Sequence, residues 1–313
     1  MFTLINAIII ATLISGTPLV IAALGELVVE KSGVLNLGIE GMMAFGALAG
    51  FAVSYHTGQP ALGVAAAILA GMALSLIFAV LTLTLMANQV ACGLALSIAG
   101  LGLAGFMGKP YEALSLPQIP HLPIPILSEI PVIGAIFFQH QILVYVSWGL
   151  FAAILWFLYK TRAGLLLRAL GESPNSAHAI GANVIAIRYA AVLFGGAMAG
   201  LAGGYMSMFF TPLWDERMIS GRGWIAAALV VFATWRPARV MLGAYLFGGV
   251  MILQLFIQGS DQSALYSINI PAQFLSAMPY LATILVLVLI SRNRRTMRLH
   301  SPAALGQSFR PDF

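Results

Sequence analysis

Charged residues are scarce in this chain of 313 residues. Asp, Glu, Lys and Arg together make up only 8% of it, whereas 60% of its residues are hydrophobic and its mean hydropathy is +0.96. A soluble globular domain carries about 25% charged residues. This shortage excludes a water-soluble fold and indicates an all-α polytopic membrane protein, because apolar runs of about 20 residues suit helices that cross a bilayer.

Motifs for catalysis and for metal binding are also missing. The single cysteine, Cys92, excludes an intrachain disulfide. The five histidines are scattered without metal-ligand spacing. The chain contains no phosphate-cradling P-loop, no G-x-S-x-G motif and no His-Glu-x-x-His motif. We therefore expect a non-enzymatic chain that has no metal and no cofactor, and that is neither an ATPase nor an intramembrane protease.

Apolar runs dominate what is present. They predict about nine (8–10) transmembrane helices. The run 222–235 is short for a full crossing, so it is tilted, re-entrant or longer than drawn. The predicted spans are 2–23, 33–55, 61–86, 90–108, 140–159, 184–210, 222–235, 239–258 and 270–291.

The basic residues are distributed unevenly between the predicted loops. With the C-terminus in the cytoplasm and the N-terminus outside, only Lys109, Arg217 and Arg222 lie outside. This agrees with the positive-inside rule for a multi-pass protein of the bacterial cytoplasmic (inner) membrane, and the same rule explains a pI near 9.6 without a nucleic-acid partner. The basic residues on the inside are Lys31, Lys160, Arg162, Arg168, Arg188, Arg236, Arg239, Arg292, Arg294, Arg295, Arg298 and Arg310.

The chain divides into a transmembrane domain, residues 1–298, and a cytoplasmic tail, residues 299–313. The domain contains a proline-rich external loop, 109–139, which we expect to be stiff and irregular. This loop is either a spacer or a docking surface for an external partner. Segment 56–74 resembles segment 234–252, since each has a polar turn, a proline and then an apolar helix that contains glycines. Their opposite predicted orientations indicate an inverted repeat, as in transporters.

Polar side chains in and near the spans are candidates for a translocation pathway. Ser32 is expected to begin a helix that carries Asn36 and Glu40 on one face, within two turns of the cytoplasmic surface. These two residues either contact substrate or bond each other and a neighbouring helix end. Isolated amides also join membrane helices without any role in transport. The candidates are Asn36, Glu40, Asn88, Gln89 and Gln254, of which Asn88 and Gln89 lie in a turn and are also expected to be capping residues.

A polar, basic segment at 160–183 interrupts the apolar pattern on the cytoplasmic side. Ser173 suits an N-cap, Pro174 suits the first helical position, and Gly181 suits the position after a helix, where a positive φ is needed. The helix between them has about two turns, and such a helix is marginal alone in water. The segment is therefore either an ordinary basic loop or a helix that needs a soluble partner.

The residues of this segment resemble a known family. The run TRAGLLLRALGESPNSAHAIGANV is similar to the cytoplasmic coupling segment of permeases in the branched-chain amino acid/ribose class of ABC importers. Ser176 and Ala182 depart mildly from that pattern. The runs GELVVEKSGVLNLGIEGMMAFGALAG and GWIAAALVVFATWRPARVMLGAYLFGG resemble blocks of its nucleoside and simple-sugar branch.

The resemblance implies an ABC importer permease fold and a mechanism. An extracytoplasmic substrate-binding lipoprotein would deliver nucleosides to this permease and to a second, homologous permease in a heterodimer within membrane lipid. Separate ABC ATPase subunits would drive alternating access. The implied ATPase-coupling residues are Arg168, Gly171, Glu172, Ser173, Pro174, Asn175, Ala177, His178 and Gly181.

Other functions remain open. Simple sugars such as ribose or galactose are alternative substrates, and branched-chain amino acids are a third. An ion-coupled secondary transporter would need acidic residues at mid-depth in the membrane. Glu40 is the only candidate well inside a span, and its expected place near one end of that span disfavours this class.

Overall fold

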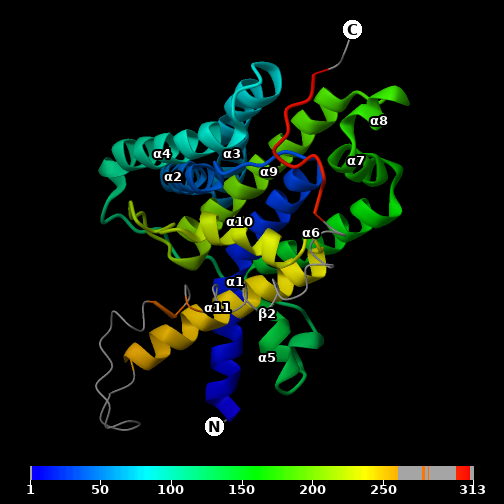
Figure 1. The fold of residues 1–313 in the computed structure, drawn as a ribbon. Helices are drawn as coiled ribbons and strands as arrows, with labels where there is room; N and C mark the ends of the chain where they lie inside the picture. Colours follow the sequence, from blue (N-terminus) through cyan, green and yellow to red (C-terminus); the bar gives the residue numbers. More distant parts are fainter. Residues whose placement is uncertain (1, 260–276, 279–280, 282–300, 311–313) are drawn as a thin grey trace.

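A computed structural model describes residues 2–259, 277–278, 281 and 301–310 of the chain (Figure 1). These residues form a helical bundle that carries one antiparallel pair of two-residue strands. The elements are α1 Phe2–Lys31, α2 Ile39–Thr57, α3 Pro60–Ala79, the π turn η1 Val80–Thr84, α4 Gln89–Gly108, the 3-10 turn η2 Lys109–Tyr111, β1 Leu122–Pro123, the 3-10 turn η3 Leu127–Glu129, α5 Ile133–Phe137, β2 Gln139–His140, α6 Ile142–Lys160, α7 Arg162–Glu172, α8 Pro174–Ala179, α9 Val184–Tyr205, the π turn η4 Met206–Phe210, α10 Arg222–Phe232 and α11 Pro237–Gly259.

The long apolar helices confirm a polytopic membrane protein, but they do not confirm nine spans. Six helices among the described residues are long and apolar enough to cross a bilayer, and α2 is not one of them. Helix α10 has 11 residues, about 16 Å at 1.5 Å per residue, which is too short for a core of about 30 Å. The expected span 270–291 lies outside the described residues except at 277–278 and 281.

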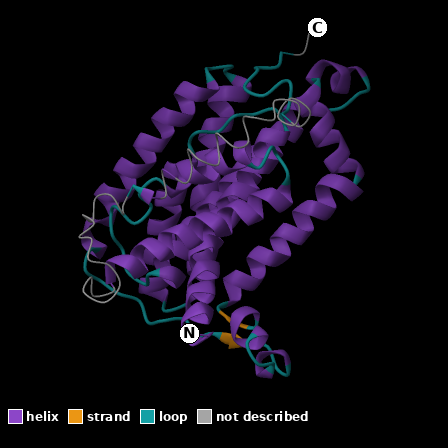
Figure 2. Ribbon diagram, turned by 60° about the horizontal axis from the view of Figure 1, so that its bottom comes forward, coloured by secondary structure: helices purple, strands orange, loops and turns teal. Residues whose placement is uncertain are grey.

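Helix α9 packs against both α2 and α3 with very close backbone contact. Figure 2 shows the long helices side by side, with the short strands near the end of the bundle where α1 begins. A Cβ atom added to Gly200 would lie 2.1 Å from the carbonyl oxygen of Ala67 on α3, and one added to Gly203 would lie 1.9 Å from that of Met43 on α2. Within lipid, the hydrophobic effect does not drive helices together, so helix association depends on such close packing. The glycines of α9 therefore allow this helix to lie very close to α2 and α3.

The connection between α1 and α2 is not helical. The sequence predicted a helix from Ser32 with Asn36 and Glu40 on one face, and this prediction is wrong. Helix α1 ends at Lys31, Gly33 adopts a φ of +87°, and α2 begins only at Ile39. A glycine enters this region without a Cβ clash, and the Asn36 side chain accepts a hydrogen bond from the Gly38 backbone N–H, which favours a turn.

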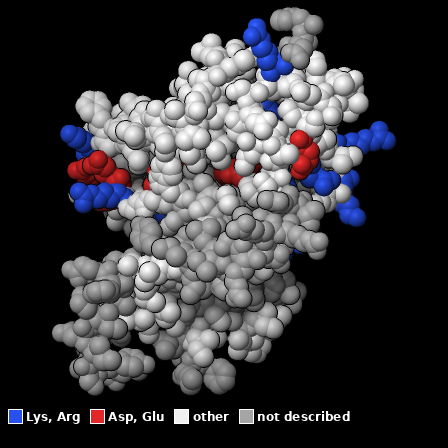
Figure 3. Space-filling model, viewed as in Figure 1, with Lys and Arg blue, Asp and Glu red and all other residues white. Residues whose placement is uncertain are grey.

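The proline-rich segment is irregular, as predicted, and consists of short turns, β1 paired with β2, and the five-residue helix α5. Figure 1 shows α5 and β2 at the end of the bundle where α1 begins. Helices α7 and α8 and segment 301–310 lie at the opposite end. The later part of segment 109–139 and the polar segment 160–183 thus lie at opposite ends of the bundle. On the face drawn in Figure 3, the described charged side chains lie mainly in the upper half of the molecule, away from the end that carries α5.

Candidate functional site

Helix α7 was not foreseen from the sequence and leads directly into the predicted coupling helix. The Thr161 side chain caps it by accepting a hydrogen bond from the Gly164 backbone N–H at 3.0 Å. Leu166, Leu167 and Leu170 lie on its inner face. Their spacing, with Arg162 and Arg168 in the same segment, is the sequence signal that could have predicted this helix. Helix α7 is thus an amphipathic helix fixed to the bundle on one side.

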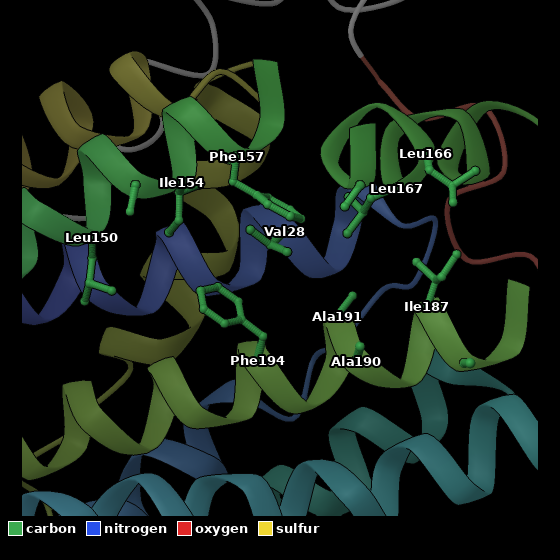
Figure 4. A pocket seen from close by; sticks show the side chains of 13 residues that line it. Val28, Leu150, Ile154, Phe157, Leu166, Leu167, Ile187, Ala190, Ala191 and Phe194 are labelled. Atoms are coloured by element: carbon green, nitrogen blue, oxygen red, sulfur yellow. The ribbon is translucent and has the colours of Figure 1, made fainter. Parts of the chain in front are cut away.

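An apolar cavity of about 530 Å³ lies beside α7. Its walls come from α1, α6, α7 and α9, and Figure 4 shows Leu166 and Leu167 facing Ile187 and Ala191 across it. The lining residues are Val28, Leu150, Ala153, Ile154, Phe157, Ala163, Leu166, Leu167, Ala186, Ile187, Ala190, Ala191 and Phe194. The cavity therefore separates part of the inner face of α7 from α9, and its lining is entirely apolar.

Helix α8 has the structure that the sequence predicted. The Ser173 side chain caps it by accepting a hydrogen bond from the Ser176 backbone N–H at 3.3 Å, and Pro174 is its first residue. Gly181 follows with a φ of +85°. Ala177 is buried against the bundle. The predicted N-cap, the length of about two turns and the glycine after the helix are therefore confirmed.

The predicted coupling residues divide into two groups by exposure. Gly171 and Ala177 are buried, whereas Glu172, Asn175 and His178 are exposed. Arg168 is half-buried, with its guanidinium carbon 5.2 Å from the ring centre of Tyr159. The exposed group offers hydrogen-bonding side chains to another molecule.

Contacts that the sequence did not reveal tie this segment to the α1–α2 connection. A Cβ at Gly171 would lie 2.4 Å from the carbonyl oxygen of Lys31, so the two backbones touch. Arg188 of α9 is buried, and it donates hydrogen bonds to the carbonyl oxygens of Ser32, at 3.2 Å, and Gln307, at 3.0 Å. Counting the basic residues on each side of the membrane could not reveal that Arg188 is buried in the packing. These contacts join α7 and α9 to the end of α1 and to the start of residues 32–38.

Glu40 contacts the N-terminus of α10. Its carboxylate accepts hydrogen bonds from the backbone N–H groups of Gly221 and Gly223, both at 2.6 Å, and of Trp224, at 3.3 Å. Free N–H groups and the helix dipole favour an anion at this position. The sequence placed Glu40 near the cytoplasmic surface and residue 222 outside. Their contact contradicts that separation, because the short α10 begins beside the buried end of α2.

Three other predicted pathway residues lie near one another. Gln89 accepts a hydrogen bond from the Leu35 backbone N–H at 2.8 Å, and the Asn36 N–H donates to Glu26 at 3.2 Å. Asn88 caps α4 by accepting from the Ala91 N–H at 3.0 Å, so its predicted capping role is confirmed. These side chains satisfy backbone groups of residues 32–38 and the start of α4.

Gln254 lies apart from this group. It is half-buried on α11, and Gly248 of that helix touches Thr12 and Gly16 in the first half of α1. Thr12 and Glu26 are separated by about 21 Å along α1 at 1.5 Å per residue. The five predicted pathway residues therefore do not form one continuous site.

Comparisons with known proteins agree with this architecture. The family model described as "Branched-chain amino acid transport system / permease component" matches residues 8–291. A putative glucose ABC transporter permease of Haloferax volcanii is 41% identical over 96% of both chains. A guanosine ABC transporter permease of Bacillus subtilis is 34% identical over 91% of this chain and 92% of its own, and a nucleoside ABC transporter permease of Lactococcus lactis is 33% identical over 88% and 90%. No solved structure gives a significant match.

Proposed function

We propose that this chain, which belongs to the family of branched-chain amino acid transport system permease components, is the permease subunit of an ABC importer that carries nucleosides across the cytoplasmic membrane. The observation that carries the proposal is the similarity, over about nine tenths of the chain, to two permeases named for guanosine and for nucleosides. The chain is a transport component, and ATP hydrolysis resides on a partner ATPase.

Glucose is the second candidate substrate. The relative at 41% identity is named for glucose, and this chain aligns with almost its whole length. A nucleoside and a simple sugar share a hydroxylated ring, and only the nucleoside adds a planar base. Uptake experiments with both solutes are therefore needed to separate the two.

The coupling segment, residues 160–183, is the proposed site of ATPase action. Exposed Glu172, Asn175 and His178 form its outer surface, and the contact of Gly171 with Lys31 carries displacement to the α1–α2 connection. From there α2 continues the path, since Glu40 links it to the N-terminus of α10. Alternating access then consists of a rigid push on α7 and α8 that changes the path between α1 and α2.

The remaining partners follow from the same proposal. A substrate-binding lipoprotein docks at the end of the bundle that carries residues 109–139, opposite the coupling segment. A second, homologous permease completes a heterodimer within membrane lipid. The N-terminus lies outside and the C-terminus in the cytoplasm, with residues 1–298 as the transmembrane domain and 299–313 as the tail.

Transport by reconstituted proteoliposomes tests the function. The complete complex, with both permeases, the ATPase and the lipoprotein, is supplied with ATP and labelled guanosine, adenosine or glucose. We expect ATP-dependent uptake of the nucleosides, with unlabelled nucleoside but not glucose as a competitor. Uptake of glucose alone would establish the second candidate. Uptake that persists without ATP and the ATPase while a proton gradient is held would refute the importer.

Glu172→Ala tests the coupling segment. The side chain is exposed, so we expect normal insertion and folding. Removing its contact with the ATPase is expected to lower uptake about tenfold, the equivalent of roughly 1.4 kcal/mol, while substrate-independent ATP hydrolysis continues. Uptake and ATPase activity are measured on the same proteoliposomes.

The matched control is Glu216→Ala, which removes an exposed carboxylate outside both the coupling segment and residues 109–139. An insertion after Ala177, which breaks the frame of α8, is expected to uncouple more completely. Unchanged uptake and unchanged substrate-stimulated hydrolysis in both coupling variants would argue against this role.

A further inference from the structure

Segment 301–310 is fixed against the coupling segment by backbone hydrogen bonds. The Ala304 N–H donates to the Gly171 carbonyl at 2.9 Å, and the Gly306 N–H donates to the Gly33 carbonyl at 3.0 Å. Arg188 holds the carbonyl of Gln307. These residues lie beyond 8–291, the part of the chain that the family model matches.

Apolar contacts add to this attachment. Phe309 is buried in a small cluster with Leu170, Ala177 and Val184, which joins α7, α8 and α9. Its ring centre lies 5.6 Å from that of His178 in an edge-on arrangement. Burying an aromatic side chain contributes a few kcal/mol at most, and it adds to the two backbone hydrogen bonds and to the one from Arg188.

A polar cavity of about 380 Å³ lies between segment 301–310 and the start of α8. Glu172, Ser173 and Asn175 form one wall, while Gln307 and Ser308 belong to the other. Arg310 adds a positive charge, so both signs of charge face the same space. The cavity suits a hydrogen-bonding side chain and would be a poor site for an acyl chain.

We propose that segment 301–310 and the coupling segment together form a two-part docking surface for the ATPase, with the polar cavity receiving a hydrogen-bonding ATPase side chain. This inference rests on the proposed function, since the ATPase is its occupant. Helix α8 has only six residues and offers a small surface by itself. The exposed Gln307, Ser308 and Arg310 extend that surface beside Glu172 and Asn175.

Thiol protection tests the proposal. The single cysteine, Cys92, is half-buried and is first replaced by serine. Asn175→Cys and Ser308→Cys then report on the two parts of the surface, and Glu112→Cys serves as a control at the other end. The purified permease complex is labelled with a maleimide with and without the ATPase. We expect the ATPase to slow labelling about tenfold or more at positions 175 and 308 and to leave position 112 unchanged.

The outcomes distinguish the two proposals. Protection of position 175 without protection of position 308 would overturn the two-part surface while leaving the coupling segment as the docking site. Protection of neither position would refute the docking site itself. In a second measurement, Phe309→Ala is expected to release segment 301–310, to weaken ATPase binding about tenfold and to abolish protection at position 308. ATPase binding that is unchanged in Phe309→Ala would also overturn the proposal.

Discussion

Gly200→Ala is expected to prevent normal packing of the transmembrane bundle. The added Cβ would lie 2.1 Å from the Ala67 carbonyl oxygen, and because that oxygen belongs to the backbone, the clash cannot be relieved by rotating a side chain. Helices α3 and α9 must therefore separate by an ångström or more. Overpacking a tight core costs about 1–3 kcal/mol, and in lipid no hydrophobic gain offsets the lost helix contacts.

Thermal unfolding of the protein in detergent measures this effect. We expect a Tm lower by several degrees and a smaller yield of monodisperse protein. Gly149→Ala on α6 is the matched control, because its Cβ meets no atom within 4 Å among the described residues. Helix propensity alone favours alanine over glycine by about 1 kcal/mol, so the control should be neutral or stabilising. Equal Tm values for the two variants would contradict the close packing of α9.

Glu40→Ala is expected to abolish uptake and to destabilise the protein. It removes the acceptor of three backbone N–H groups at the N-terminus of α10 and leaves them unpaired, and that of Gly223 is buried. Hydrogen bonds to a charged group contribute about 1.5–3 kcal/mol each, and an unsatisfied buried donor costs a similar amount. Thermal unfolding and nucleoside uptake are measured together.

Glu40→Gln separates the acceptor from the charge. Its amide retains one carbonyl oxygen, so we expect stability between that of the wild type and that of Glu40→Ala. Glu216→Ala, on an exposed carboxylate outside residues 109–139, controls for loss of a negative charge. If Glu40→Ala had the stability and the uptake of the wild type, the contact between α2 and α10 would contribute to neither folding nor transport.

Local features of the fold were predictable from the sequence. Hydropathy identified most helices, and the echoing segments at 56–74 and 234–252 do form helices that begin at Pro60 and Pro237. They pack along the two long helices α9 and α1. The cap at Ser173 and the positive φ at Gly181 were also predictable, because each depends on residues only a few positions apart.

Long-range features were not predictable. Glu40 and its partner Gly221 are 181 positions apart, so no local pattern relates them. Arg188 counted as one more cytoplasmic charge, yet its contacts with Ser32 and Gln307 are buried. Helix α1 runs to Lys31, eight residues beyond the predicted span 2–23, and Gly33 follows it with a φ of +87°. The assignment of pathway and coupling roles to individual residues stays a prediction.

The break between α1 and α2 has a mechanical consequence. Side chains satisfy three of its backbone N–H groups: Gln89 accepts from Leu35, Glu26 from Asn36, and Asn36 from Gly38. In a continuous helix these groups would bond to backbone carbonyls, and a sharp bend in lipid would leave some of them unsatisfied at a cost of several kcal/mol each. Side-chain acceptors can rotate with the groups that they bind, so we expect the chain to bend at residues 32–38 more readily than within α1 or α2. This expected hinge lies where the coupling segment touches the end of α1, at Gly171 and Lys31.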